Sequence, residues 1–404
     1  HLRLHTPMAS QSESEEECGS SSHGEYEALR DGDSGSAQQE CATELPLSFL
    51  RGVSTGEALY SGRVSRASAV EYGAGMEALR AHSPMATRQL HLLACRECEP
   101  LAAQMLATRL GKKYMCAGNI KWGTFPDGYP NTFISRIDEL RNADVVFLAD
   151  FLNPANLFEQ FSLLYVLPRY SCRSVTVVLP YFPTGTMERV EHEGQVATAM
   201  TLARMMGGMP LGQRGPAKLM IYDIHALQVR FYFSDTVLPV LLTAIPLLKR
   251  VLCKRYVDPQ REIVITFPDD GACKRFARYF DGYELVICAK VRDGDKRVVR
   301  VKDGEVSGRA TLIVDDLVQT GGTLIECKNA LVAAGATSVG CFVTHAVFPN
   351  QSWKRFTPEA GQDFDTFYVT DSCTDTVKQL RGRKPFEVIS LANDIVRRLL
   401  QHTI

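Results

Sequence analysis

Apolar and polar positions alternate in a regular order from about residue 89 to the end of the chain. Runs of four or five β-forming apolar residues predict strands, and the longer amphipathic stretches between them predict helices. In the first half, the predicted strands are 90–94, 145–148, 175–179 and 218–222. The predicted helices are 99–110, ended by Gly111, and 153–167 and 195–206.

The second half of the chain repeats this rhythm. Its predicted strands are 263–266, 284–287, 311–314 and 338–344. Its predicted helices are 271–280, 324–334 with Gly335 closing the pattern, and 390–402. Apolar strands separated by helices are typical of parallel sheets covered on both faces. The fold class is therefore α/β, with one such sheet in each half.

Residues 1–86 differ from the rest of the chain. They are rich in Ser, Gly, Glu and Ala, include an acidic run between Glu13 and Glu17, and show no sustained apolar period. Such a segment buries too little apolar surface to offset the entropy lost on ordering, so we predict a disordered extension. Two interpretations stay open for it, a docking or regulatory tail and a merely solvated extension.

Charge and cysteine content narrow the class of protein. Of the 404 residues, 45% are hydrophobic and 23% charged, as in globular proteins of two or three domains. A net charge of −1 gives no general attraction to nucleic acid or to an anionic membrane, so neither is an expected partner. No apolar run reaches the roughly 18 residues of a membrane span. The 12 cysteines have no repeating spacing, which favours reduced thiols in a cytoplasmic protein.

The strongest candidate for chemistry is a pair of acids followed by a small polar loop. The residues are Asp315, Asp316, Gln319, Thr320, Gly321, Gly322 and Thr323. The loop would expose backbone N–H groups at the start of a predicted helix, which suits a phosphate, and the two carboxylates suit vicinal hydroxyls. Ribose 5-phosphate carries both groups. An ordinary strand-to-helix turn capped by Asp is the alternative for so short a motif.

Asp223 and His225 form a second candidate site, directly after the predicted strand 218–222. Strand alternation would send both side chains to the same side, where they could hold Mg²⁺ and a triphosphate. A histidine satisfied within the core is the alternative.

A third candidate is another strand-to-helix turn, made of Asp269, Asp270, Gly271 and Ala272. Its small residues and helix N-terminal amides could bind pyrophosphate oxygens. A helix cap formed by one of the two acids is the alternative, and one residue could serve both purposes.

Two polar loops complete the candidates. The segment from Lys290 through Arg292 to Arg297 is basic and contains Gly294, which is typical of a mobile hairpin that could close over a polyphosphate. Taken alone, this loop is better explained as a solvated charged turn. The loop around Phe125 and Asp127 offers a ring to stack on a base and a carboxylate to accept from an exocyclic amine. A purely structural aromatic loop is the alternative.

Together these stretches resemble a known family. The acid pair with its loop resembles the phosphoribosyl pyrophosphate motif of type I phosphoribosyltransferases and ribose-phosphate pyrophosphokinases. With the stretches 179–185, 221–228 and 344–349 added, residues 89–404 look like a ribose-phosphate pyrophosphokinase, nearest to the plant-type, phosphate-independent class. The resemblance implies two tandem phosphoribosyltransferase-like domains, 87–238 and 239–404, with the helix 390–402 returning to the first. It also implies a homo-oligomer.

The resemblance implies a reaction and a role for each stretch. Mg-ATP and ribose 5-phosphate would be the substrates, and phosphoribosyl pyrophosphate and AMP the products. Phe125 and Asp127 would bind adenine, and Asp223 and His225 the metal and triphosphate. The turn 269–272 would bind pyrophosphate. Lys290, Arg292 and His225 would be catalytic, and the stretch 315–323 would bind ribose 5-phosphate.

Several positions depart from the phosphate-activated class of the family. Thr186-Met187-Glu188 stands close to the place of an Arg-Gln-Asp sequence, and Tyr129 replaces an acidic residue of the ATP loop. These departures imply an altered nucleotide specificity and altered allosteric control. A base-salvage phosphoribosyltransferase and a non-catalytic regulatory paralogue are the alternatives to a synthetase.

Overall fold

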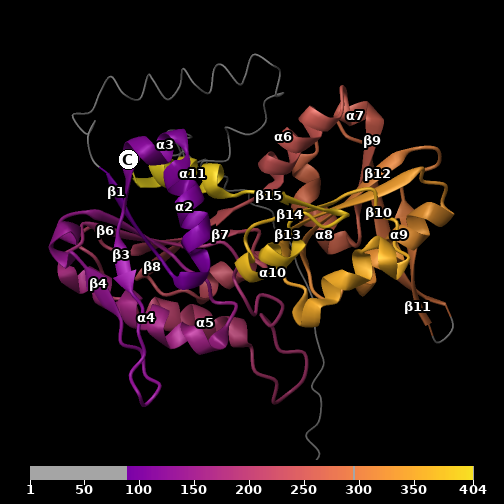
Figure 1. Ribbon diagram of the computed structural model, residues 1–404. Helices are drawn as coiled ribbons and strands as arrows, with labels where there is room; N and C mark the ends of the chain where they lie inside the picture. Colours follow the sequence, from indigo (N-terminus) through magenta and orange to yellow (C-terminus); the bar gives the residue numbers. More distant parts are fainter. Residues whose placement is uncertain (1–88, 294–295, 404) are drawn as a thin grey trace, which may run out of the picture. The chain divides into compact units, whose positions relative to one another are not determined.

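The computed structural model describes residues 89–293 and 296–403 (Figure 1). The predicted extension 1–86 lies outside these residues. Two mainly parallel sheets contain nearly all of the strands in the described residues. The prediction of an α/β fold with two parallel sheets is therefore confirmed. No helix within the described ranges is long and apolar enough to cross a membrane.

The first sheet is parallel throughout, with the strand order β2-β1-β5-β6-β7-β8. Its strands are β1 (Leu90–Ala94), β2 (Met115–Ala117), β5 (Asp144–Leu148), β6 (Ser174–Leu179), β7 (Ala217–Tyr222) and β8 (Val237–Leu242). Two short strands, β3 (Asn119–Lys121) and β4 (Phe133–Ser135), form a separate antiparallel pair. The central strand β5 is buried along its whole length, as a parallel strand covered on both faces must be.

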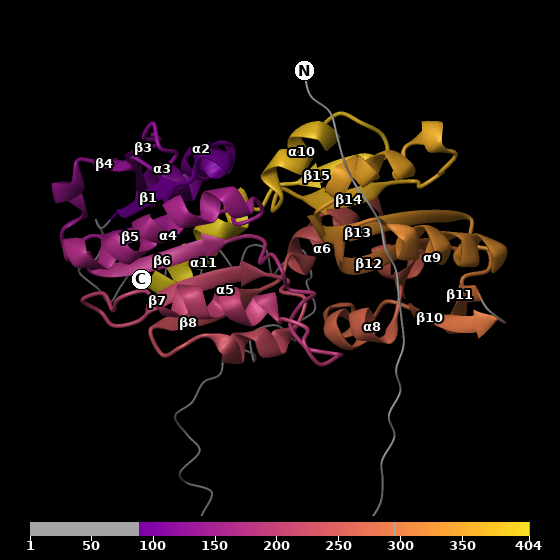
Figure 2. The same cartoon turned by 90° about the horizontal axis from the view of Figure 1, so that it is seen from below.

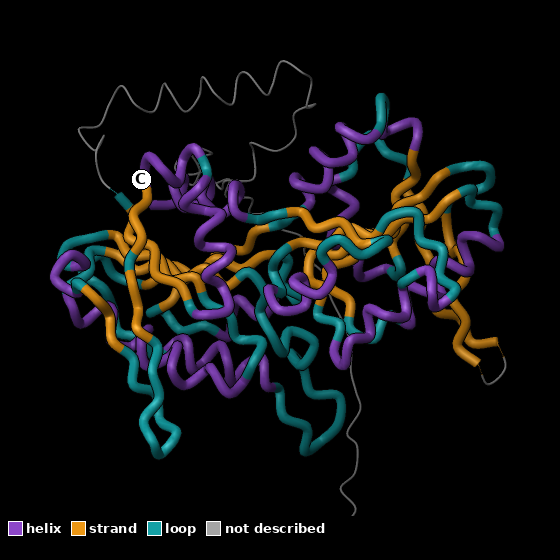
Figure 3. Tube along the Cα trace, viewed as in Figure 1, coloured by secondary structure: helices purple, strands orange, loops and turns teal. Residues whose placement is uncertain are grey.

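Helices cover both faces of this sheet (Figure 3). They are α2 (Glu99–Ala107), α3 (Arg109–Tyr114), α4 (Leu157–Val166), α5 (Thr198–Gly207) and α11 (Ala392–Thr403). Shorter 3-10 helices in the chain are η2 (Arg96–Cys98), η3 (Ile137–Leu140), η4 (Pro154–Asn156), η5 (Leu167–Tyr170), η6 (Leu227–Tyr232), η7 (Ala277–Tyr279), η8 (Pro349–Phe356) and η9 (Pro358–Ala360).

The second sheet has the order β11-β10-β9-β12-β13-β14-β15 and is parallel except for the pair β10–β11. Its strands are β9 (Ile263–Phe267), β10 (Leu285–Asp293), β11 (Lys296–Asp303), β12 (Ala310–Val318), β13 (Ser338–Ala346), β14 (Phe367–Thr370) and β15 (Phe386–Ile389). The helices of this half are α6 (Ile245–Arg255), α7 (Pro259–Glu262), α8 (Asp270–Phe276), α9 (Gly322–Ala333) and α10 (Thr374–Leu380). The hairpin β10–β11 lies at one edge of the sheet, and α9 lies beside β12 and β13 (Figure 2).

One predicted helix boundary is wrong. The helix 99–110 does not end at Gly111 but breaks at Thr108, whose extended backbone separates α2 from α3. The Thr108 side chain accepts a hydrogen bond from the Gly111 N–H and so caps α3. A Cβ at Gly111 would lie 2.0 Å from the Met105 carbonyl oxygen, so this glycine permits a close approach inside α3 rather than ending α2.

The border between the two halves lies near β8. The expected border after residue 238 falls inside β8, which pairs with β7 and so belongs to the first sheet. The last helix α11 returns to the first half, where Asp394 accepts a hydrogen bond from the buried Tyr222 hydroxyl at 3.0 Å. Just before this helix, the Ser390 hydroxyl donates to the Gln104 side chain at 2.8 Å.

Candidate active site

The acid pair lies at the carboxyl end of β12. This strand continues through both acids to Val318, so it is longer than the predicted 311–314. Asp316 is 4% exposed, and Asp315 is half-buried with its Oδ1 accepting the Asp316 N–H at 2.9 Å. Because ligands of parallel α/β sheets bind beyond the carboxyl ends of the strands, both acids stand where a ligand would be expected.

Asp316 joins the two halves of the chain. Its Oδ2 lies 2.8 Å from His225 Nδ1, although the two residues are 91 positions apart. The same oxygen accepts a hydrogen bond from Arg275 Nη1 at 2.9 Å, and this nitrogen also donates to the His225 carbonyl at 2.8 Å. The turn after β7 is thus held to the end of β12 by a carboxylate shared between a guanidinium and an imidazole.

These contacts shift the pKa of each partner. The hydrogen bond to Asp316 raises the pKa of His225 above its ordinary value. Burial alone would raise the pKa of Asp316, but the hydrogen bond from His225 and the charge of Arg275 lower it below its ordinary value. Burial and the neighbouring Asp316 carboxylate raise the pKa of Asp315 well above its usual range.

Asp223 is placed differently from His225. β7 ends at Tyr222 and Asp223 has a positive φ of 34°, so strand alternation does not set the direction of these two side chains as expected. Asp223 is 4% exposed, and its Oδ2 accepts hydrogen bonds from the Ala244 N–H at 2.9 Å and the Thr344 hydroxyl at 2.6 Å. The His225 side chain, in contrast, is 40% exposed.

A buried histidine lies directly beneath this turn. His345 on β13 contacts the Tyr222 carbonyl through Nε2 at 3.0 Å and the Ser372 hydroxyl through Nδ1 at 2.9 Å. Burial lowers the pKa of His345 to about 4, so this ring is neutral near pH 7. Since a carbonyl only accepts, Nε2 carries the proton and donates to Tyr222.

The loop after β12 is open at the start of α9. Gln319 and Thr320 are exposed, and Gly321 precedes α9 with a φ of 78° and no side-chain cap. The first amides of a helix have no partner within the helix, so those of α9 remain available for an anion. A Cβ at Gly321 would lie 2.2 Å from the Phe356 ring, whereas Gly322 has open space around it.

The turn at 269–272 is a capped helix start. Asp269 Oδ1 accepts the Ala272 N–H at 2.9 Å, so the capping alternative holds for this residue. Asp270 forms two contacts with Lys302 Nζ, at 2.8 and 2.9 Å. Gly271 lies between them, and a Cβ there would come within 3.1 Å of Asp269 Oδ1.

Among the described side chains, no hydrogen bond or ion pair joins Lys290, Phe125 or Asp127 to the acid pair. In the antiparallel pair β10–β11, Lys290 is exposed and pairs with Val299, and the Arg292 backbone pairs with Arg297. The predicted hairpin is thus present, while its tip at 294–295 lies outside the described residues. In the other loop, Phe125 is 49% exposed, and Asp127 Oδ1 accepts the Tyr129 N–H at 3.1 Å.

A cavity of about 220 Å³ lies beside His225. Its wall consists of Thr186, Met187, Glu188, Arg189, Glu191, Gln195 and His225. Glu188 is 8% exposed, and its charge contributes to the raised pKa of His225 after the larger effect of Asp316. The segment that departs from the phosphate-activated class therefore lines the space next to the candidate catalytic histidine.

Sequence reasoning missed two residues of this site. Arg275 belongs to a Lys-Arg pair at the end of a short helix, and such pairs are common on protein surfaces, so no motif marked it. His345 lies in the stretch 344–349, whose mark in the sequence is its resemblance to the family. A histidine in an otherwise apolar strand is the one local signal that would have pointed to it.

The fold and site define a protein of two phosphoribosyltransferase-type domains, with the acid pair on the second. A family model for the N-terminal domain of ribose phosphate pyrophosphokinase matches residues 90–209, and one for the phosphoribosyl transferase domain matches residues 259–369. The chain belongs to the ribose-phosphate pyrophosphokinase family, as its resemblance implied.

Individual relatives agree with this assignment. Ribose-phosphate pyrophosphokinase 4 of Arabidopsis thaliana is 48% identical over 78% of this chain and 92% of its own length. The protein of that name in Oryza sativa subsp. japonica is 49% identical over 79% of this chain and 98% of its own. The crystal structure of phosphoribosylpyrophosphate synthetase from Mycobacterium smegmatis matches the fold with a TM-score of 0.65, at 22% identity, over 78% of this chain and 100% of its own. Enzymatic function as a ribose-phosphate pyrophosphokinase is thereby supported for the chain.

Proposed function

We propose that this chain transfers the pyrophosphoryl group of Mg-ATP to the C1 hydroxyl of ribose 5-phosphate, giving 5-phosphoribosyl 1-pyrophosphate and AMP. The contact between His225 and Asp316 is the observation that carries the proposal. It brings a residue expected on the ATP side within hydrogen-bond distance of a residue expected on the ribose side. Transfer between two bound substrates requires this proximity.

On the ribose side, the carboxylates of Asp315 and Asp316 accept hydrogen bonds from the sugar hydroxyls. Asp316 Oδ2 is already shared between His225 and Arg275, so these two groups hold in place the carboxylate that the sugar would meet. The loop from Gln319 to Thr323 binds the 5-phosphate through the first amides of α9, which have no side-chain cap.

On the ATP side, the exposed ring of Phe125 stacks on the base, and Asp127 accepts from its amine. His225 faces the triphosphate. At the start of α8, the Gly271 N–H lies where it can donate to the transferred pyrophosphoryl group, while Asp269 caps the helix through the Ala272 N–H and Asp270 pairs with Lys302. The raised pKa of His225 favours its protonated form, which suits a phosphate partner.

Lys290 and Arg292 stabilise the charge that develops during transfer. Lys290 is exposed on β10, so it has freedom to approach a bound polyphosphate. Phosphoryl-type transfers depend mainly on positioning and on charge neutralisation, and both residues supply positive charge. Together with His225 they form the proposed catalytic set.

Magnesium is the proposed cofactor. Mg²⁺ takes oxygen ligands and often binds through one or two carboxylates plus substrate phosphates. The described residues contain no cluster of three acidic, His or Cys side chains that could hold a metal alone, which fits an ion that arrives with ATP. Asp223 has one carboxylate oxygen engaged by Ala244 and Thr344, so it would complete the shell of such an ion rather than form it, and His225 would contact the phosphates that the ion binds. Bound Mg²⁺ would neutralise the phosphate charge.

An end-point assay tests the proposal. The purified chain with ATP, ribose 5-phosphate and Mg²⁺ should form AMP and phosphoribosyl pyrophosphate in equal amounts. A base-salvage phosphoribosyltransferase would form no AMP but would consume phosphoribosyl pyrophosphate with a free base. A non-catalytic regulatory paralogue would do neither alone and would change the rate of an active subunit.

We also propose self-association through the first half of the chain. Large apolar side chains are exposed on α5 and on the adjoining η6, and Phe231 is 79% exposed. Burying such a patch against a second copy would be favourable. Phe231→Asp should reduce the sedimentation coefficient of the native protein, whereas Val257→Asp, at an exposed position outside these elements, should leave it unchanged.

We propose a cytoplasmic location for the protein because of its free thiols. All the cysteines in the described ranges are free, as expected in a reducing compartment. Relatives named mitochondrial and chloroplastic make organelles the competing assignment. Imaging of the natural full-length product fused to a fluorescent protein at its C-terminus would decide between them.

A further inference from the structure

The segment that follows β13 has an unusual backbone. Phe348, Asn350 and Gln351 have φ values of 42°, 54° and 57°, a region that residues other than glycine seldom adopt. Such conformations persist only where the surroundings hold them. Phe348 is 3% exposed, and its ring packs edge-on against Phe356 at 5.5 Å, so both ends of the segment are anchored in the core.

The anchored segment presents two polar side chains of η8 to the phosphate loop. The Ser352 hydroxyl donates to the Gln319 carbonyl at 2.7 Å, and Arg355 Nη1 donates to the Thr320 carbonyl at 2.6 Å. The Phe356 ring occupies the space that a side chain at position 321 would need. Two consecutive carbonyls of the loop are therefore directed toward η8.

This direction decides where the loop amides point. In a trans peptide the C=O and the following N–H point to opposite sides. With the carbonyls of Gln319 and Thr320 held by η8, the N–H groups of Thr320 and Gly321 point away from it. We infer that Ser352 and Arg355 are positioning residues that aim these amides at the 5-phosphate of the sugar. The inference rests on the proposed function and extends the ribose site beyond the motif 315–323.

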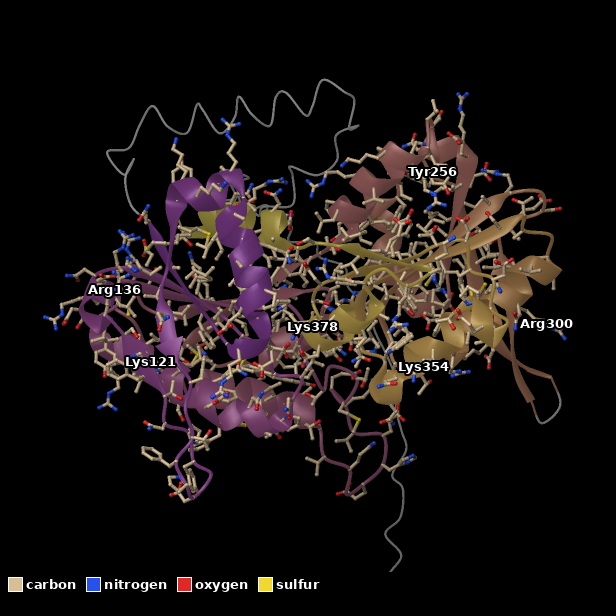
Figure 4. All side chains as sticks on the ribbon, in the orientation of Figure 1. Lys121, Arg136, Tyr256, Arg300, Lys354 and Lys378 are labelled. Carbon is tan, nitrogen blue, oxygen red and sulfur yellow. The ribbon has the colours of Figure 1, made fainter. Side chains whose placement is uncertain are left out.

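Arg355 has a matched neighbour on the same segment. Lys354 is also exposed and carries the same charge, and Figure 4 labels it. Its Nζ lies over the Trp353 ring at 5.7 Å, whereas Arg355 donates to the loop. Replacing either residue by alanine removes one positive charge from η8, but only the change at Arg355 removes a contact with the loop.

The test compares Michaelis constants for the two substrates in the full chain. A neutral hydrogen bond typically changes an equilibrium by a few-fold, and a charge-assisted one by about tenfold or more. Ser352→Ala should raise the KM for ribose 5-phosphate about threefold, and Arg355→Ala about tenfold. The KM for ATP should stay within twofold, Arg355→Lys should recover most of the loss, and Lys354→Ala should behave like the wild type.

The outcomes separate this inference from the proposed function. If the wild type forms no AMP from ATP and ribose 5-phosphate, the proposed function fails. If the wild type is active but Arg355→Ala matches Lys354→Ala, the positioning role is refuted. An equal rise in both Michaelis constants, or no recovery with lysine, would also refute it, because either indicates a general structural effect. Should Arg355→Ala not fold, Ser352→Ala decides instead: a KM for ribose 5-phosphate equal to that of Lys354→Ala would refute the positioning role.

Discussion

Removing the charge of Asp316 should weaken the folded state in a pH-dependent way. Asp316→Asn preserves the side-chain shape and one acceptor oxygen but removes the negative charge that His225 and Arg275 share. The Asp316 side chain is 6% exposed and that of Arg275 is 14% exposed, so this part of the contact is poorly screened by solvent. The His225 side chain is 40% exposed, so its part must be discounted.

These exposures set the expected magnitude. Hydrogen bonds to charged groups contribute about 1.5–3 kcal/mol when shielded, and the neutral amide retains part of that. We expect a loss of about 1–2 kcal/mol from the Arg275 contact and at most about 1 kcal/mol from the solvent-screened His225 contact. The combined loss of unfolding free energy for Asp316→Asn is thus about 2 kcal/mol.

The pH dependence follows from the direction of each pKa shift. The pKa of His225 is raised in the folded state, so its contribution is complete below its ordinary value of 6.5 and disappears as the pH rises through the raised pKa. The pKa of Asp316 is lowered, so its contribution is complete above its ordinary value of 3.8 and disappears as the pH falls through the lowered pKa. Both contributions are complete between pH 3.8 and 6.5.

Urea unfolding at pH 5.5 and at pH 8.5 would measure the effect. The difference between wild type and Asp316→Asn should be larger at pH 5.5, and proton NMR should show a lower pKa for His225 in the variant. Asp270→Asn is the matched control, because its partner Lys302 is half exposed, and it should change stability little at either pH. An equal difference at both pH values would refute the reasoning about His225.

Three further predictions concern turnover and the loop. Lys290→Ala and Arg292→Ala should each lower kcat about 10²–10³-fold, or about 3–4 kcal/mol, with little change in KM, as steady-state assays would show. Because the segment 186–188 departs from the phosphate-activated class, the chain should form AMP from ATP and ribose 5-phosphate in phosphate-free buffer. Strict dependence on added phosphate would contradict the assignment to the phosphate-independent class. In a thermal unfolding assay, Gly321→Ala should destabilise the protein by more than about 1–3 kcal/mol, because residue 321 has a φ of 78° and the Phe356 ring occupies the space of the new Cβ. Gly322→Ala should be tolerated in the same assay, because the space around Gly322 is open.

Strongly apolar strands were the most predictable part of this fold. β5, β6, β7 and β9 follow their predicted ranges closely because each is a largely apolar run that is buried along nearly all of its length. β8 was missed, since Pro239 within it argues against a strand. The structure resolves this conflict by placing β8 at the edge of its sheet, where a missing N–H costs no ladder hydrogen bond on the open side.

Short strands and the helix break could not be predicted from the sequence, for a different reason. β14 and β15 have four residues each, too few to show a period against the surrounding apolar background. The break between α2 and α3 depends on Thr108, whose neighbours continue the helical pattern on both sides. Local periodicity could not reveal it, because the break is fixed by one hydroxyl and one close backbone approach at Gly111.

The candidate site was predictable as stretches but not as an arrangement. Each stretch carries its own local signal, such as an acid pair or a glycine turn. The contact of His225 with Asp316 has no such signal, because it joins residues 91 positions apart through the packing of two sheets. The same holds for Arg275, which reaches the same carboxylate oxygen. Contacts of this kind depend on tertiary structure, which a local pattern does not specify.

The position of Asp316 connects the two proposed substrates energetically. Its Oδ2 holds His225 and Arg275, so binding of a sugar hydroxyl to the same carboxylate would alter the charge that these two groups experience. By linkage, if bound ribose 5-phosphate changed the affinity of a phosphate at His225, that phosphate would change the affinity of the sugar by the same factor. A single buried carboxylate would thus couple the binding of the two proposed substrates. A separate acid for each substrate would provide no such coupling.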